Sequence, residues 1–169
     1  MSSEGRGSVG GAKLAVLLLT ALAILVADQL TKALVVANLA VGERAWVIGD
    51  LVQIWHVRNA GAAFSLFQGG MLLFIVISVL SIGMVVYFHR TLRDRATWLH
   101  VVLGVVLGGT LGNFADRLRL GYVTDWLSVG IGELRWPTFN VADSSIVIGI
   151  GVLVVVLAFA SPDRSEAPA

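Results

Sequence analysis

Long apolar stretches alternate along this chain with shorter segments that are rich in glycine and charged residues. Each apolar stretch comes close to the roughly 20 residues that an α-helix needs to cross the hydrocarbon core of a bilayer. The pattern therefore predicts an all-α membrane protein with four transmembrane helices. We expect these helices at residues 13–37, 71–88, 96–115 and 141–160.

The first apolar stretch has a competing interpretation as a cleaved signal peptide, because Arg6 and Lys13 precede a short apolar core. However, the A-x-A pattern of this stretch lies at residues 21–23, inside the hydrophobic segment rather than after it. We therefore expect an uncleaved helix, preceded by a disordered Gly/Ser-rich tail at residues 1–12.

The third stretch carries glycines at a strict four-residue spacing, Gly104, Gly108 and Gly112. Such a ridge of small residues allows another helix to approach closely. The spacing serves internal helix contacts as well as dimers, so it does not predict the oligomeric state.

The polar segments predict a small amount of extramembrane structure. Residues 38–68 alternate between apolar and polar positions with turn residues between them, which is typical of short strands. Within them, AAFSLFQ (62–68) predicts a short interfacial helix or turn. In residues 116–140, glycines and Pro137 predict turns, with a hairpin as one arrangement.

The arginines of the loop after the second stretch, Arg90, Arg93 and Arg95, set the expected topology, because short Lys/Arg-rich loops stay in the cytoplasm. Four spans then place both termini in the cytoplasm and the loops 38–70 and 116–140 outside. We expect a single four-helix transmembrane domain at 13–160, followed by a disordered cytoplasmic tail at 161–169.

The composition agrees with a membrane protein, since 57% of residues are hydrophobic and 14% are charged. The net charge of +1 gives no basic surface for nucleic acid. The absence of cysteine excludes disulfides and thiolate catalysis, and the three scattered histidines form no ligand cluster. We therefore expect neither a metal nor a cofactor.

Asp125 and Asp143 are the main candidates for chemistry, because they lie at the two ends of one external loop between adjacent antiparallel helices. Two carboxylates a few ångströms apart share a proton, so one can activate a water while the other protonates a carbonyl oxygen. Ser144 and Ser145 have no histidine or lysine beside them in sequence, which argues against a serine nucleophile. A first-turn carboxylate that meets a helix dipole is the alternative role for Asp143.

Other polar residues near the apolar stretches are candidates for supporting roles. Asn113, Asp116 and Arg117 share a helix face if the third helix extends that far, and an interfacial Asp116–Arg117 ion pair is the alternative. Asp28 and Lys32 are four residues apart, which favours mutual neutralisation or a headgroup-binding role over catalysis.

Five motifs in order resemble the lipoprotein signal peptidases (signal peptidase II) of bacteria. They are DQLTK (28–32), NAGAAFS (59–65), GGTLGNFADR (108–117), GYVTDW (121–126) and FNVADSS (139–145). The family fold implies an extramembrane β-cradle and a short interfacial helix on the outer side. Trp126 stands where the family motif usually has an aromatic or aliphatic residue, with Phe being common.

The resemblance implies an aspartic endopeptidase of the bacterial inner membrane, with its active site near the outer leaflet. Its substrates would be diacylglyceryl-modified prolipoproteins, cleaved just before the lipid-bearing cysteine, and the cyclic peptide globomycin would inhibit it. Asp125 and Asp143 match the catalytic pair of the family. The matching supporting residues are Asn59, Asn113, Asp116, Arg117, Asn140, Asp28 and Lys32.

Two other classes of protein remain as alternatives. A transporter would use the carboxylates as a proton relay, but the second apolar stretch and most of the third lack charge, so no path crosses the membrane. A structural subunit would use the glycine ridge and would not require Asp125 and Asp143 together.

Overall fold

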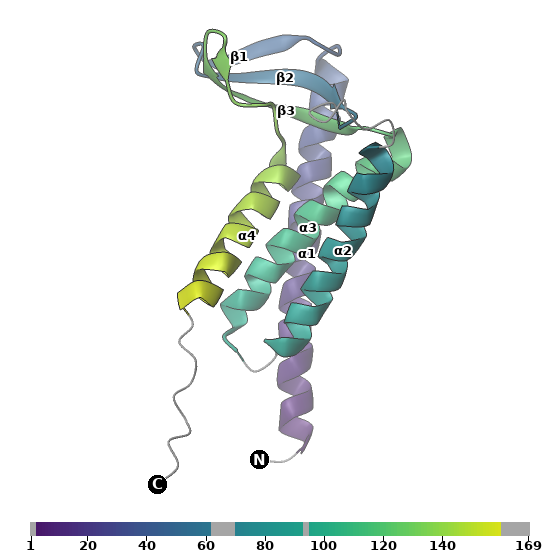
Figure 1. Ribbon diagram of the computed structural model, residues 1–169, viewed down its shortest axis with the longest axis vertical. Coiled ribbons are helices and arrows are strands. Elements are labelled where there is room, and N and C mark those ends of the chain that lie inside the picture. Colours follow the sequence, from purple (N-terminus) through teal and green to yellow (C-terminus); the bar gives the residue numbers. More distant parts are fainter. Residues whose placement is uncertain (1–2, 62–69, 93–94, 160–169) are drawn as a thin grey trace.

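A computed structural model describes residues 3–61, 70–92 and 95–159 of this 169-residue chain. The helices form an elongated bundle, and a small sheet lies across one end of it (Figure 1). The beginning of α1 and the end of α4 lie at the opposite end. In chain order the elements are α1 (Ser3–Asn38), β1 (Arg44–Ile48), β2 (Val52–Asn59), α2 (Gly70–Thr91), α3 (Thr97–Leu120), β3 (Val123–Ile131), β4 (Leu134–Arg135) and α4 (Val141–Phe159).

Three of the helices are long and apolar enough to cross a membrane, namely those at Gly10–Asn38, Gly70–Thr91 and Thr97–Leu120. The fourth helix is also apolar, but its stretch Val141–Val156 is shorter. Length and composition therefore confirm three of the four predicted spans, and the fourth stays a prediction.

Two helix boundaries differ from the sequence-based prediction. α1 begins at Ser3, so the helical backbone includes most of the segment expected to be a disordered tail. Once a helix is nucleated, each further residue is added at little cost. α3 continues to Leu120 and ends where Gly121 adopts φ 78° and donates its backbone N–H to the carbonyl oxygen of Arg117. Asp116 is consequently helical and not part of a loop.

α3 is the central helix of the bundle. In its most apolar window 56% of residues are buried, against 11% in the corresponding windows of α1 and α2. The glycine ridge lies against α1, because an added Cβ on Gly104 or Gly108 would lie 2.5 Å from the carbonyl oxygens of Leu17 or Ala21 respectively. The ridge therefore serves an internal helix contact.

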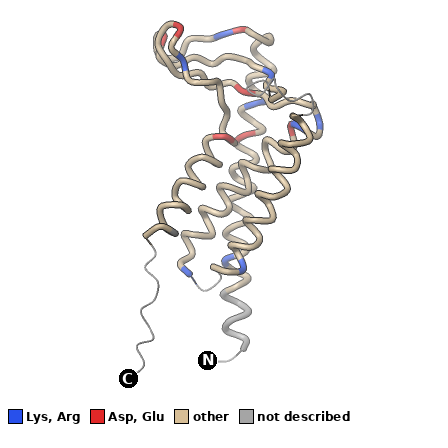
Figure 2. Tube along the Cα trace, in the orientation of Figure 1, with Lys and Arg blue, Asp and Glu red and all other residues tan. Residues whose placement is uncertain are grey.

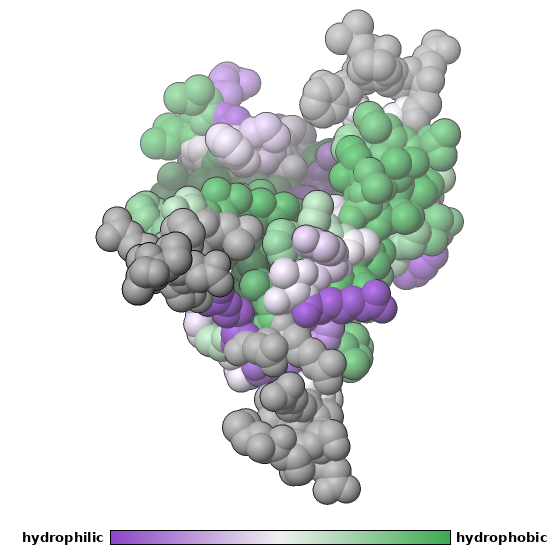
Figure 3. All heavy atoms as spheres, turned by 60° about the horizontal axis from the view of Figure 1, so that its bottom comes forward, coloured by the Kyte–Doolittle hydropathy of each residue, from purple (hydrophilic) through white to green (hydrophobic). Residues whose placement is uncertain are grey.

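The distribution of polarity is the reverse of that in a water-soluble bundle. Large apolar side chains such as Leu19, Leu80 and Val147 are more than 60% exposed, and apolar surface is prominent on the bundle in Figure 3. Charged side chains such as Asp28 and Lys32 are buried. This arrangement suits a bilayer, where helices present apolar surface to lipid and turn ionisable groups toward each other.

The sheet has the antiparallel order β1-β2-β3-β4. The short strands predicted within residues 38–68 are confirmed as β1 and β2. β3 and β4 pair within the loop predicted to contain turns. The pairing of β2 with β3, which joins both external segments in one sheet, was not predicted from alternation. The interfacial helix expected at 62–68 lies outside the described residues.

Candidate active site

The structure brings Asp125 and Asp143 together through shared hydrogen bonds with Asn140. Figure 2 shows acidic residues along the chain trace where the sheet meets the bundle. Asp125 lies on β3, and Asp143 lies in the first turn of α4. One residue contacts both: Asn140 donates its Nδ2 to Asp125 Oδ1 at 2.8 Å and its backbone N–H to Asp143 Oδ2 at 3.2 Å. The two carboxylates are therefore held on either side of a single asparagine.

Asp143 is fixed by the way α4 begins. The side-chain oxygen of Asn140 accepts the backbone N–H of Asp143 at 2.9 Å, while Asp143 accepts the backbone N–H of Asn140. This reciprocal pair is the capping box of a helix N-terminus, with an aspartate in the acidic position. Because the cap uses the amide oxygen of Asn140, its Nδ2 group is left to donate to Asp125. Asp143 therefore lies at the start of a helix, as the alternative prediction held, and it also shares Asn140 with Asp125.

Asp125 is 2% exposed and pairs in the sheet with Val57 of β2. Its second oxygen accepts a hydrogen bond of 2.9 Å from Nδ2 of Asn59, the last residue of β2. Burial, reinforced by the negative charge of Asp143, raises the pKa of Asp125 to about 7, although the bonds from Asn59 and Asn140 and the charge of Lys32 oppose the shift. This carboxyl group can therefore hold or release a proton near neutral pH.

Asn113 links the carboxylate pair to a second polar cluster. Its Nδ2 donates to Asp143 Oδ1 at 2.6 Å, and its Oδ1 accepts from Lys32 Nζ at 2.9 Å and from Asn140 Nδ2 at 3.2 Å. With a cation on its oxygen, the amide can only present its NH₂ group to Asp143. Lys32 thereby sets the orientation of a donor to the site.

The second cluster is a buried triad of Asp28, Lys32 and Asp116. Lys32 Nζ lies 2.8 Å from Asp28 Oδ2 and 2.9 Å from Asp116 Oδ2. Asp28 also accepts the backbone N–H of Ala142 at 3.0 Å, so α1 helps to cap α4. The predicted neutralisation of Asp28 by Lys32 is confirmed.

The alternative pairing of Asp116 with Arg117 is wrong among the described residues, because neighbours on a helix point in different directions. Arg117 instead lies 4.6 Å from the ring centroid of Phe74 on α2 and donates to the carbonyl oxygen of Asn113. The positive charge of Arg117 still interacts at longer range with the carboxylates of Asp143, Asp125 and Asp116, without forming an ion pair with Asp116.

Two residues of this network were not predicted. Gln29 donates to Asp116 Oδ1 at 3.0 Å and to Asp28 Oδ2 at 3.2 Å, and the backbone N–H of Thr124 donates to Asp116 Oδ2. Gln29 belongs to the DQLTK motif, so its place beside Asp28 was the available signal. The contact of Thr124 depends on tertiary structure alone.

An apolar groove of about 410 Å³ lies between α2, α3 and α4, and its near end comes within one helical turn of this site. Its wall includes Thr110, one turn before Asn113, and Ile146, one turn after Asp143. The rest of the lining is mostly apolar and includes Ile77, Leu80, Phe88, Leu103 and Ile150. An extended or helical apolar ligand in this groove would have one end near the carboxylates.

Fold and site together define a membrane enzyme whose paired carboxylates lie where a helical bundle meets an extramembrane sheet. Residues 20–159 match the family described as "Signal peptidase (SPase) II", and the chain belongs to this family. The sequence is 46% identical over 138 residues to a "Lipoprotein signal peptidase" of Rhodococcus jostii, covering 78% of this chain and 67% of that protein. It is 45% identical over 150 residues to the protein of the same description from Dehalococcoides mccartyi, covering 84% of this chain and 90% of that one.

Solved structures are similar as well. Two of them are described as a "Bacterial membrane enzyme", with TM-scores of 0.75 and 0.76. The first is 28% identical and covers 94% of both chains, and the second is 29% identical and covers 89% of this chain and 95% of that one. Helical bundle and sheet are therefore a shared architecture. The roles of individual site residues stay predictions.

Proposed function

We propose that this protein is an aspartic endopeptidase that removes the signal peptide of diacylglyceryl-modified prolipoproteins just before the lipidated cysteine. Family membership and the descriptions of the relatives support peptidase activity on lipoprotein signal peptides. The observation that carries the aspartic mechanism is the pair of Asp125, which is buried, and Asp143, which is partly buried, with Asn140 donating a hydrogen bond to each.

The proposed reaction begins with one proton shared by the pair. The ionised carboxylate takes a proton from a water molecule, whose oxygen attacks the scissile carbonyl carbon, while the other carboxyl protonates the carbonyl oxygen. In the second step the tetrahedral carbon expels the amine, which takes up the proton gained by the first carboxylate. The carbonyl oxygen returns its proton to the other carboxyl, so the pair ends with one proton, as it began. The pair titrates as a unit, and a pKa of about 7 at Asp125 keeps the singly protonated form populated near neutral pH.

The surrounding amides give each carboxylate a fixed direction. Asp125 accepts from Asn59 and Asn140, and Asp143 accepts from Asn113. Preorganised donors of this kind cost no rearrangement when the substrate reacts. They are positioning residues in this proposal.

The site also suits a substrate confined to a membrane. The lipid-bearing peptide would diffuse in the plane of the bilayer, with apolar groups in the groove between α2, α3 and α4 and the scissile bond near the carboxylates. In the proposed orientation α4 completes four spans in the bacterial inner membrane. Both termini are then cytoplasmic, and the carboxylates face the outer leaflet. Globomycin would compete for this site.

The proposal is tested by cleavage of a lipidated prolipoprotein with purified wild type, Asp125→Asn and Asp143→Asn in detergent. Each variant should retain its fold, judged by thermal unfolding, and lose about 10²–10⁴-fold in rate. Glu133→Gln is the matched control, because it neutralises an exposed carboxylate in the turn between β3 and β4. Near-normal cleavage by either folded aspartate variant would remove that residue from the mechanism.

A further inference from the structure

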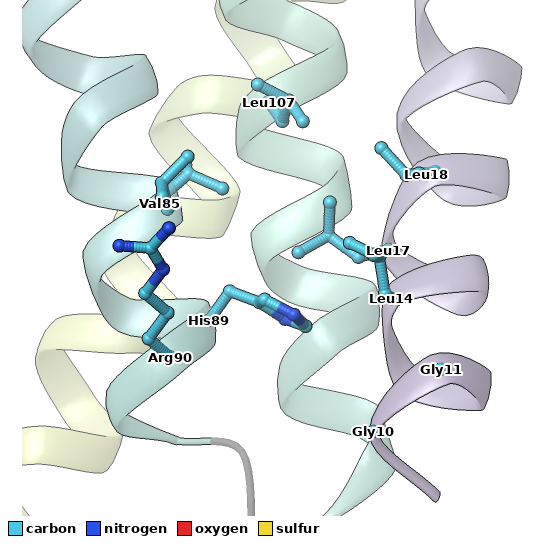
Figure 4. Close-up of a pocket in the computed structure, with 10 residues that line it drawn as sticks. Gly10, Gly11, Leu14, Leu17, Leu18, Val85, His89, Arg90 and Leu107 are labelled. Carbon is cyan, nitrogen blue, oxygen red and sulfur yellow. The ribbon is translucent and has the colours of Figure 1, made fainter. Parts of the chain in front are cut away.

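A second groove lies at the other end of the bundle, far from the carboxylate pair. It is a cavity of about 480 Å³ between residues 10–18 of α1 and the last turns of α2, with Leu107 of α3 behind it (Figure 4). The volume falls in the range of small-molecule sites, roughly 300–1,000 Å³. It exists because α1 and α2 both pack chiefly against α3 rather than against each other.

The walls of this groove are apolar. Leu14 and Leu18 of α1 and Val86 of α2 line it and are 42%, 52% and 45% exposed. Gly11 leaves open space at the end of the groove near the start of α1, since a Cβ added there would meet no atom within 4 Å. A surface of this kind, within helices that are apolar enough to span a membrane, is suited to a hydrocarbon chain.

The mouth of the groove is polar and basic. Arg90 is exposed there, and His89 projects from α2 toward α1 in Figure 4. Lys13 and Arg95 belong to the same end, where Lys13 Nζ donates to the carbonyl oxygen of Arg95 at 2.6 Å. The acidic residues with described side chains lie instead at the junction and in the sheet (Figure 2). The sequence that joins α2 to α3 is also basic, because residues 88–96 contain three arginines and one aspartate.

Histidine nitrogens beside the groove give an independent indication of a ligand. Nδ1 of His89 and both ring nitrogens of His100 are buried without a hydrogen-bond partner among the described residues. The two rings pack edge to face, with centroids 5.1 Å apart, and His100 is fully buried. Of the two histidines only His89 lines the groove, and His100 lies behind it. Buried polar atoms are normally paired, so the unpartnered Nδ1 of His89 favours an occupant that can form a hydrogen bond there.

From these observations we infer that this groove binds one anionic phospholipid. The phosphate lies at Arg90 and His89, and an acyl chain lies along Leu14, Leu18 and Val86. Basic pockets between membrane helices on the cytoplasmic side suit anionic headgroups, and the proposed orientation of α1 puts the groove on that side. The inference concerns binding alone, so it stands or falls separately from the proposed cleavage.

The test is native mass spectrometry of the detergent-purified full chain with phosphatidylglycerol and with phosphatidylcholine of identical acyl chains. Wild type should retain one phosphatidylglycerol in preference to phosphatidylcholine. Arg90→Gln should lower that preference about fivefold, the equivalent of about 1 kcal/mol for one basic residue. Equal retention of the two lipids by wild type would overturn the inference.

A second pair of variants tests the location. Gly11→Phe should fill the groove and abolish retention of the lipid. Gly83→Phe is its matched control, because Gly83 is exposed on α2, also has no atom near an added Cβ and does not line the groove. If folded Gly11→Phe still retains the lipid, or if both variants lose it equally, the lipid binds elsewhere on the protein. Displacement of the lipid by a synthetic signal peptide would identify a peptide groove instead and would also overturn the inference.

Discussion

Lys32→Met is the most informative single perturbation of this bundle. Lys32 is the only cation of a buried triad with two carboxylates, so its removal leaves Asp28 and Asp116 together without compensation. Removing one partner of a buried ion pair typically costs about 3–5 kcal/mol. For a chain of this size each kcal/mol corresponds to about 2–4 °C, so we expect the melting temperature to fall by about 6–20 °C.

The charge balance of the triad makes the prediction more specific. Asp28→Asn leaves one cation facing one carboxylate, whereas Lys32→Met leaves two carboxylates and no cation. We therefore expect Asp28→Asn to be the milder change, and the double variant Asp28→Asn/Lys32→Met to be more stable than Lys32→Met alone. Thermal unfolding in detergent, followed by tryptophan fluorescence, measures all three.

Lys32→Met should also reduce activity below the unfolding temperature. Without Lys32, the amide of Asn113 loses the cation on its oxygen and is free to turn its NH₂ group away from Asp143. Peptidase rate at a temperature where the variant is folded reports this effect separately from stability. A melting temperature within about 2 °C of wild type, or a larger loss in Asp28→Asn than in Lys32→Met, would refute the reasoning.

Two further predictions concern titration and helix packing. Because the pKa of Asp125 is raised from 3.8 to about 7 in the folded protein, ionising it opposes folding, and stability should fall as pH rises from about 4 through 7. The shift corresponds to a loss of about 4 kcal/mol at most. Asp125→Asn should flatten this dependence in thermal unfolding at a series of pH values, and an unchanged slope would contradict the raised pKa. Gly108→Ala should destabilise the bundle by about 1–3 kcal/mol, because its methyl group would press on the backbone of Ala21, whereas Gly83→Ala has open space and should be neutral or slightly stabilising. Equal melting temperatures for these two alanine variants would show that the ridge is not tightly packed.

The sequence predicted the helices well, because hydropathy over some 20 residues is a strong local signal. It did not predict where α3 ends, since Asp116, Arg117 and Arg119 look like the start of a loop and only Gly121 marks the true end. The carboxylate pair was predictable from its place at the edges of apolar stretches and from the motifs.

The contacts that organise the site were harder to predict. Lys32 reaches Asp116 and Asn113, which lie more than 80 positions further along the chain, and spacing along α1 revealed only its pairing with Asp28. The pairing of β2 with β3 was equally invisible, because alternation identifies a strand but not its partner.

That strand pairing has a consequence for the order of events during synthesis. Asn59 emerges early, while its partner Asp125 and the cap at Asn140 and Asp143 emerge only after three helices have been made. A nascent chain that stops after α3 has neither catalytic candidate, and one that stops after β3 has a single carboxylate without its bridging asparagine. In the proposed mechanism the protein should therefore remain inactive until its last helix has been inserted, and an incomplete chain should not cleave signal peptides in the membrane where it is assembled.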